Sequence, residues 1–297
     1  MNTDLRVAVC SNRVPSAVGE ALEALRGQVG EGSLALITSG LPAAAEAAHR
    51  RAFAGTVLSE PRPGLSRARN RALAWAAESG ADALAFVDDD AVAGPGWFEA
   101  LRRRWDEAPP EVACIGGPIR PRYGVEPPPW FSDGIAHVLT LLDRGPRVRD
   151  LDPDAEAVYG ANISFRVEPL RSAGGFDPAL GHAGGRVFFA EEDEAQRALV
   201  RLGYRVRYVP DAAVEHVIPA ERLTRGSFIR RRFAFGAALG LRGGRGHGLA
   251  ARQAIASGGG ALVAALSGRQ ALAMERAVRA AENAGVLYAS TSPRRIA

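Results

Sequence analysis

The sequence predicts an α/β fold, with a mainly parallel sheet covered by helices on both faces and a helical C-terminal region. Two observations predict it. Over the first 116 residues, short β-rich runs alternate with longer runs of helical apolar spacing, which is typical of successive β-α-β units. After Pro219 the pattern changes to Ala-rich helical segments around 249–266 and 269–285. We therefore expect a domain over residues 1–218 and a helical region over 219–297.

The elements follow in order along the chain. The expected strands are short apolar runs at residues 5–10, 33–38, 55–59, 83–87 and 112–116. The expected helices between them cover residues 15–29, 41–53, 65–79 and 95–105. Residues 117–157 are rich in Pro, Arg and Asp and indicate loops; a strand follows at 158–167, a turn at 174–185, a helix from near Glu191 and two short strands within 204–217.

Composition excludes several classes of protein. Hydrophobic residues make up 47% of the 297 and charged residues 24%, which excludes wholesale disorder. The net charge of +4 does not indicate a nucleic-acid-binding protein. Cys10 and Cys114 lie in apolar runs, which favours core packing over a disulfide. We find no secretory signal and no run of the ~20 apolar residues that a membrane span requires, so we expect a cytoplasmic protein.

Three consecutive carboxylates, Asp88, Asp89 and Asp90, end the apolar run at 83–87. Their mutual repulsion is tolerable only where solvent or a cation neutralises it. On an extended chain Asp88 and Asp90 point the same way and Asp89 points elsewhere. A solvated acidic turn is the alternative. Because ligands bind beyond the carboxyl ends of strands in such sheets, the apolar run favours a ligand site.

A second acidic group, Glu191, Glu192, Asp193 and Glu194, opens a helix. The helix dipole alone favours acidic residues there. The helix also has an apolar stripe, formed by Ala195, Ala198, Leu199 and Leu202. Extending it backward places Glu191 and Glu192 on the buried face and turns Asp193 away. A general base is one reason for carboxylates on such a face.

Seven segments together resemble the inverting family 2 glycosyltransferases, whose GT-A fold is a Rossmann-like nucleotide-binding α/β sheet with a smaller acceptor-binding part. In the family's order they are VAVCSNR (7–13), GLSRARNRAL (64–73), FVDDDAV (86–92), YGANISFR (159–166), GGFD (174–177), AEEDEAQRALVRLGY (190–204) and VEHVIP (214–219). The resemblance covers about residues 5–235. It implies donor binding by residues 1–116 and acceptor binding by 117–218.

The resemblance also implies roles for single residues. Asp88 would bind the donor's ribose, while Asp90 and His216 would hold Mn²⁺ or Mg²⁺. The other donor-binding residues would be Ser11, Asn12, Arg13, Arg69, Asn70, Asp89, Gly160 and Asn162. Each has an alternative without a ligand. The residues at strand ends are of types common in turns, Arg67 and Arg69 could lie on a solvated basic helix face, and His216 could be a half-buried strand histidine.

The identity of the base stays open, because the family's Glu-Asp pair aligns either with Glu191-Glu192 or, one residue later, with Glu192-Asp193. We favour Glu192. Trp130 would stack on the acceptor, with core packing of a loop as its alternative.

The function expected from the resemblance is metal-dependent transfer of a sugar from a nucleoside-diphosphate sugar, with inversion, in bacterial cell-envelope or natural-product glycosylation. A non-catalytic relative that binds nucleotide-sugar or carbohydrate is the alternative, although the positions of Asp90, the base and His216 are all filled. Nucleic-acid binding is not expected.

Residues 225–245, including Arg242 and Arg245, mix arginines with apolar residues, which is compatible with peripheral membrane contact through an interfacial helix. A helix packed on the protein is the alternative.

Overall fold

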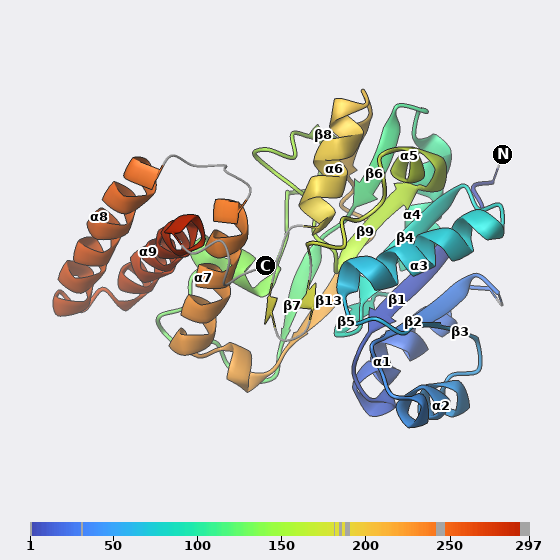
Figure 1. Ribbon diagram of the computed structural model, residues 1–297, viewed down its shortest axis with the longest axis horizontal. Coiled ribbons are helices and arrows are strands. Elements are labelled where there is room, and N and C mark those ends of the chain that lie inside the picture. The colour runs from blue at the N-terminus through green and yellow to red at the C-terminus, as the bar shows by residue number, and fades with distance from the viewer. Residues whose placement is uncertain are drawn as a thin grey trace. The chain divides into compact units, whose positions relative to one another are not determined.

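The computed structural model describes residues 2–30, 32–180, 182–183, 186–187, 191–241 and 247–291 (Figure 1). The chain forms two compact units. The first contains residues 1–121, 142–184 and 191–217, and the second contains 122–141, 185–190 and 218–297. Residues 122–141, which the expected boundary at 218 assigned to the first domain, therefore belong to the second unit.

An eight-stranded sheet in the order β3-β2-β1-β4-β9-β6-β12-β8 forms the centre of the first unit. Its strands are β1 (Leu5–Ser11), β2 (Leu34–Ser39), β3 (Thr56–Glu60), β4 (Ala83–Asp88), β6 (Val112–Gly116), β8 (Arg149–Leu151), β9 (Asn162–Arg166) and β12 (Arg205–Tyr208). β3, β2, β1 and β4 are parallel, and β12 is parallel to β6. β9 runs antiparallel to β4 and β6, and β8 antiparallel to β12. The mainly parallel α/β sheet is thus confirmed.

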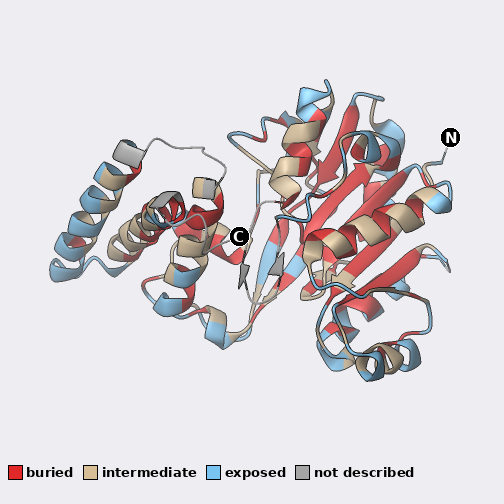
Figure 2. Ribbon diagram, viewed as in Figure 1, coloured by how far each residue is buried: buried red, intermediate tan, exposed pale blue. Residues whose placement is uncertain are grey.

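The helices of this unit are α1 (Pro15–Arg26), α2 (Ala43–Ala52), α3 (Leu65–Glu78), α4 (Trp97–Glu107), α5 (Val167–Ser172) and α6 (Glu191–Arg201). Strands β2 and β6 are buried along their whole length, as expected for strands covered on both faces (Figure 2). Cys114 is buried in β6 and both cysteines are free, so no disulfide joins them.

A smaller sheet has the strand order β5-β13-β7. Its strands are β5 (Ala91–Ala93), β7 (Ile119–Tyr123) and β13 (Val214–Ile218). Two further strands, β10 (His182–Ala183) and β11 (Arg186–Val187), pair with each other. Residues 117–157, expected as loops, contain β7, β8 and the short 3₁₀ helix η1 (Asp133–Leu139); a second one, η2 (Ala220–Arg222), follows β13.

The second unit is built on three long helices, α7 (Arg225–Leu241), α8 (His247–Leu266) and α9 (Gln270–Thr291), which confirms the helical C-terminal region. Its core joins η1 to α7 and α9 through Trp130, Ile135, Val138, Leu139, Ile218, Leu223, Phe228, Met274 and Val278. α7 and α9 approach closely, because a Cβ on Gly236 would lie 1.9 Å from the carbonyl oxygen of Glu282. α7 is therefore a packed core helix, and Arg242 and Arg245 lie outside the described residues.

Helix α8 is long and apolar enough to cross a membrane by length and composition. Its window Leu249–Leu266 has a mean hydropathy of 1.3, and only 11% of that window is buried. The expectation from the sequence concerned an uninterrupted apolar run of ~20 residues, whereas this 18-residue window contains Arg252 and Gln253 and passes by its mean hydropathy.

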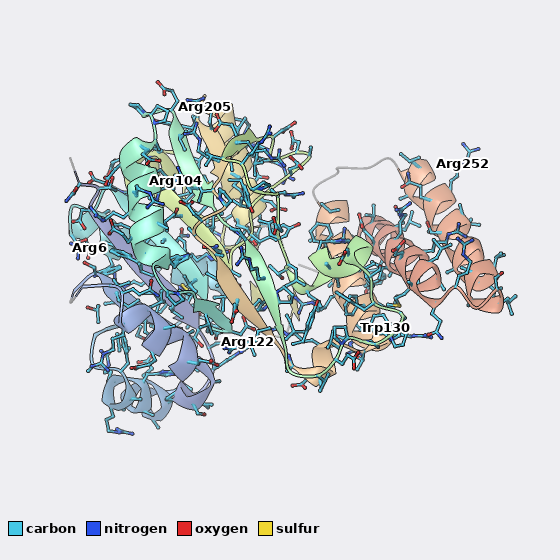
Figure 3. All side chains as sticks on the ribbon, turned by 180° about the vertical axis from the view of Figure 1, so that it is seen from behind. Arg6, Arg104, Arg122, Trp130, Arg205 and Arg252 are labelled. Atoms are coloured by element: carbon cyan, nitrogen blue, oxygen red, sulfur yellow. The ribbon has the colours of Figure 1, made fainter. Side chains whose placement is uncertain are left out.

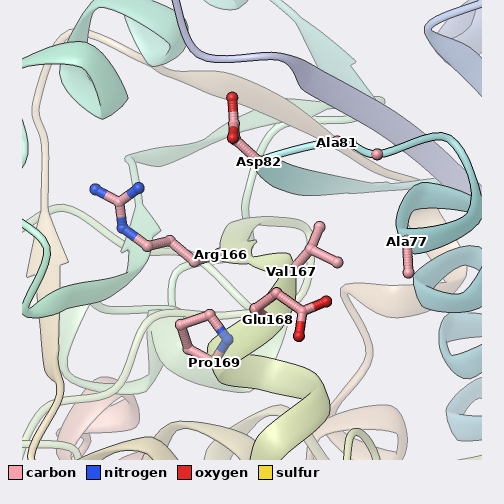
Figure 4. A pocket seen from close by; sticks show the side chains of 8 residues that line it. Ala77, Ala81, Asp82, Arg166, Val167, Glu168 and Pro169 are labelled. Carbon is pink, nitrogen blue, oxygen red and sulfur yellow. The ribbon is translucent and has the colours of Figure 1, made fainter.

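A cavity of about 330 Å³ lies at the amino-terminal end of β4, the end opposite to Asp88 (Figure 4). Asp82, Arg166 and Glu168 line it. Arg166 already donates hydrogen bonds to the carbonyl oxygens of Val112 and Ala108. We therefore assign this guanidinium a structural role.

Candidate active site

The carboxyl ends of β1 and β4 meet at one edge of the sheet, because the two strands are parallel and Cys10 pairs with Asp88. β1 has β2 on one side and β4 on the other, so the chain reverses its direction of winding here, where open α/β sheets bind ligands. β9 is antiparallel and starts at this edge, with Asn162 opposite Val87. The edge therefore gathers residues from three separate predicted segments.

The three consecutive aspartates have different partners. β4 ends at Asp88, and Asp89 and Asp90 form a turn. The expectation that Asp88 and Asp90 point the same way assumed an extended chain, and the chain is not extended there. The Ser11 hydroxyl donates to Oδ2 of Asp89 at 2.5 Å. The Arg13 guanidinium lies 3.6 Å from Asp89 and 3.2 Å from Asp90. Since this arginine is 40% exposed, it is a cation that an incoming ligand could displace.

Strand pairing brings His216 to Asp90. β13 pairs antiparallel with β5, so that His216 faces Ala91 across the strands and the Val217 amide donates to the Asp90 carbonyl oxygen at 2.9 Å. Nε2 of His216 then lies 3.2 Å from Oδ1 of Asp90. The two residues expected to hold a metal are thus adjacent, although far apart in sequence. Within the described residues, no group of three or more Asp, Glu, His and Cys side chains forms a complete metal site.

Arg69 lies at the centre of the acidic residues and is 2% exposed. Its Nη1 is 2.7 Å from Glu191 and 3.5 Å from Glu192, and its Nη2 is 3.5 Å from Asp88. The guanidinium carbon also lies 5.7 Å and 5.6 Å from the ring centres of Phe86 and Phe176, within the range of cation–π attraction. Three carboxylates therefore share one buried guanidinium.

The shared guanidinium leaves an excess of negative charge at this edge. Burial raises the pKa of Glu191 well above its usual range, Glu192 adds to the rise, and Arg69 opposes it. Burial also raises the pKa of Asp88 to about 6, against the effect of Arg69 and with the help of Asp90 and Asp89. A bound cation would relieve this repulsion.

We expect Arg69→Met to lower the free energy of unfolding by about 3–5 kcal/mol, because it leaves buried carboxylates without their counter-ion. The double variant Arg69→Met/Glu191→Gln should be more stable than Arg69→Met, since it removes one of the uncompensated charges. Arg71→Met, at a half-buried position of the same helix, is the control and should change stability by about 0.5 kcal/mol or less. Urea unfolding measures all three; equal stability of Arg69→Met and the control would contradict the central role of the ion pair.

Glu192 is the carboxylate of α6 that combines a fixed position with access to solvent. Its side chain is 17% exposed, whereas that of Glu191 is 3% exposed and bound to Arg69. Oε1 of Glu192 accepts a hydrogen bond from the Gly160 amide at 3.3 Å. Gly160 has no room for a side chain, because a Cβ there would lie 2.1 Å from Nη2 of Arg69. Asp193 is half-buried.

The buried face of α6 differs from the predicted stripe. Ala195, Gln196 and Leu199 are buried as well as Glu191, whereas Leu202 is 52% exposed. The amide of Gln196 bonds to both the N–H and the carbonyl oxygen of Val158, and so fixes the chain just before Gly160. The signal for this contact in the sequence is a polar residue, Gln196, among the apolar positions of α6.

Two predicted donor-binding amides have protein partners. The Asn162 side chain accepts from Trp97 Nε1 and donates to the carbonyl oxygens of Pro118 and Ala212. The Asn70 side chain accepts from the Phe176 amide and donates to the Phe176 carbonyl oxygen. We assign both asparagines structural roles: Asn162 ties β9 to its neighbours, and Asn70 holds the segment that places Phe176 beside Arg69.

Two other predicted residues stand apart. Asn12 is exposed at the end of β1 and has room to reach a ligand. Trp130 lies in the second unit and is 7% exposed, with its ring 5.1 Å from that of Phe228 (Figure 3). Core packing, the alternative for this tryptophan, therefore describes its environment. His49, which no pattern in the sequence singled out, is buried, and its Nε2 lies 2.8 Å from the Arg13 carbonyl oxygen, where it supports the loop after β1.

Known proteins resemble this chain over the same region. The model of the family described as Glycosyl transferase family 2 matches residues 38–172. The chain is 30% identical over 153 residues to the glucosyl-dolichyl phosphate glucuronosyltransferase of Haloferax volcanii, covering 50% of this chain and 48% of that protein. It is 28% identical over 192 residues to the succinoglycan biosynthesis protein ExoM of Rhizobium meliloti, covering 64% and 56% respectively. The chain thus spans about half the length of these curated relatives.

Among solved structures, the chain resembles that of GalNAc-T7 with UDP, GalNAc and Mn²⁺, with a TM-score of 0.54 and 13% sequence identity. This similarity covers 81% of this chain and 50% of that one, and at such low identity it shows the fold alone. The resemblance found in the seven sequence segments is confirmed. Over residues 38–172 the chain resembles glycosyl transferase family 2, and its mixed α/β sheet has the GT-A fold.

Proposed function

We propose that this chain is a metal-dependent, inverting glycosyltransferase that moves a sugar from a nucleoside-diphosphate sugar to an acceptor hydroxyl. The observation that supports it most is the gathering of Asp88, Asp90, His216, Arg69 and Glu192 at the carboxyl edge of β4. Two of the relatives' names refer to glycan chemistry, glucuronosyl transfer in one and succinoglycan synthesis in the other. The acceptor is the part of the reaction that these residues do not specify.

The donor set fits a divalent cation. Asp90 offers a carboxylate and His216 an imidazole nitrogen, 3.2 Å apart. Mg²⁺ and Mn²⁺ commonly take one or two protein ligands and complete their shell with substrate phosphates and water, so an incomplete protein site is compatible with them. When bound, the cation would neutralise charge on the departing diphosphate. Arg13, which lies beside Asp89 and Asp90, would then be free to contact a phosphate or the base.

The chain's own residues would then perform three tasks. Asp88, 35% exposed, would accept hydrogen bonds from the ribose. Arg69 would hold Glu191 and Glu192 in position, with Glu191 neutralising the buried guanidinium. Glu192 would take the proton of the acceptor hydroxyl as that oxygen attacks the anomeric carbon, and the nucleoside diphosphate would leave from the opposite side. A single displacement of this kind inverts the configuration of the sugar.

A thermal-shift panel tests the proposal. We expect one nucleoside diphosphate or nucleotide-sugar to raise the unfolding temperature more with Mn²⁺ than without it, because a ligand that binds only the folded state stabilises it by mass action. The responding ligand identifies the base. The same ligand and metal should give no such shift with His216→Ala. A panel in which no nucleotide stabilises the chain would contradict donor binding; stabilisation without turnover would favour the non-catalytic alternative.

A further inference from the structure

Helix α8 has an apolar face that no described part of the chain covers. We define the α8 outer face as Leu249, Ile255, Leu262, Val263 and Leu266. These side chains are 55–81% exposed (Figure 2). The opposite side of the helix packs on α9: Ala250 and Ala264 are buried, and Arg276 of α9 donates to the Gly260 carbonyl oxygen at 2.8 Å. Contiguous exposed apolar surface of this kind marks a binding surface.

The composition of α8 does not suit a helix whose outer side faces water. Residues 247–266 contain no Asp or Glu and one arginine, Arg252, so the outer side lacks the charged residues of an ordinary surface helix. Gly258, Gly259 and Gly260 stand in the middle of the helix, where each costs about 1 kcal/mol relative to Ala. The helix therefore depends on contacts with its surroundings: α9 supplies them on one side, and the outer face has room for a partner on the other.

Charge indicates what that partner is. Residues 218–297 contain 13 arginines and three acidic residues, a net charge of +10, whereas residues 1–217 carry −6. Exposed arginines stand near both ends of the outer face. Arg252 lies on α8 near its start (Figure 3), and Arg269 follows its end. The exposed Arg225 also lies near that end, because its Nη2 donates to the side chain of Gln270. An apolar helix face bordered by arginines fits an anionic lipid surface.

We propose that α8 docks in the headgroup region of an anionic lipid bilayer, with its outer face against the acyl chains and the arginines at the phosphates. A second copy of this chain would bring two surfaces of high positive charge together and would be repelled. A spanning orientation would require α8 to leave α9 and break the hydrogen bond from Arg276. The sequence indicated an interfacial helix within 225–245; the structure points to α8 instead, because α7 is packed in the core. The inference rests on the second unit alone and does not depend on the proposed function.

Vesicle co-sedimentation with the full chain tests the proposal. The vesicles contain phosphatidylglycerol and phosphatidylcholine in equal parts, or phosphatidylcholine alone. We expect binding to the mixed vesicles at low salt and weaker binding to the neutral ones. Leu262→Gln/Leu266→Gln should lower affinity for the mixed vesicles by about tenfold or more, since it removes two apolar side chains from the lipid contact without adding charge. Leu202→Gln, at an exposed leucine of the turn that follows α6, is the control and should bind as the wild type does.

Both variants change exposed side chains, and unchanged thermal unfolding would verify that they fold. Absence of wild-type binding to the mixed vesicles would overturn the proposal. Equal binding by the double variant would also overturn it, because the arginines alone would then account for attraction to lipid. Light scattering measures the oligomeric state of the wild type and of the double variant. A dimeric wild type and a monomeric double variant would overturn the proposal and would assign the outer face to a second copy of the chain.

Discussion

Replacing Glu192 by Gln is expected to lower single-turnover sugar transfer about 10²–10⁴-fold, because the substitution keeps the shape of the side chain and removes its basic site. Donor and metal binding should persist, since Glu192 contacts Nη1 of Arg69, Asp88 contacts Nη2, and Glu192 is not a proposed metal ligand. The measurement is transfer under saturating donor, together with nucleotide affinity for each variant.

The neighbours of Glu192 provide the controls within one helical turn. Glu191→Gln should reduce stability more than Glu192→Gln, because it removes the carboxylate bound 2.7 Å from Arg69. Asp193→Asn should change transfer little, since the contacts to Arg69 and Gly160 come from Glu191 and Glu192. An inactive Asp193→Asn enzyme beside an active Glu192→Gln enzyme would show that the base is one residue later and that the assignment to Glu192 is wrong.

Asp90→Asn is expected to abolish metal-stimulated turnover while the chain stays folded. The substitution removes one of only two protein groups proposed to hold the cation. With a single protein ligand left, the affinity of the site for the cation should fall strongly. The experiment is titration calorimetry of Mn²⁺ with the nucleotide identified by the thermal-shift panel. Asp154→Asn is the control, because the Asp154 side chain is 79% exposed, pairs with Arg197 and is assigned no part in the donor or metal site. Unchanged Mn²⁺ affinity in Asp90→Asn would contradict the metal assignment.

The sequence was sufficient to predict the sheet and the edge at which the candidate residues of β1 and β4 meet. An apolar run such as 83–87 is a reliable sign of a buried strand, and parallel strands that end together place Ser11 and Asp88 at one edge. The burial of Glu191 also follows from helical spacing. In each case the information is local, since it depends on residues within one strand or one helix.

Contacts between distant segments could not be predicted in the same way. Arg69 was expected either to bind the donor or to lie on a solvated basic helix face, and its burial depends on Phe86, Phe176 and Glu191, which come from three other segments. The pairing of β13 with β5 brings His216 to Asp90, and no pattern within either strand specifies that register.

In the second unit, amino-acid composition did not predict which residues and helices are buried. Trp130 follows three prolines in a stretch that reads as a loop, yet it lies in a core whose other members come mainly from η1, α7 and α9. α7 and α8 are both rich in Ala and Gly, so their sequences do not show which of them is covered. The distinction comes from packing: close contact with α9 requires Gly236 in α7, whereas nothing lies near a Cβ added at Gly258 or Gly259 of α8.

Anomalous diffraction from crystals grown with Mn²⁺ and the nucleoside diphosphate tests whether Asp90 and His216 hold the metal and whether Asp88 binds the donor. We predict a manganese peak within bonding distance of an Asp90 carboxylate oxygen and of Nε2 of His216, with the ribose at Asp88 and the diphosphate on the metal. A manganese peak elsewhere would contradict the assignment of Asp90 and His216 as metal ligands. A nucleotide bound at the cavity lined by Asp82 and Arg166, at the opposite end of β4, would contradict the assignment of the donor site.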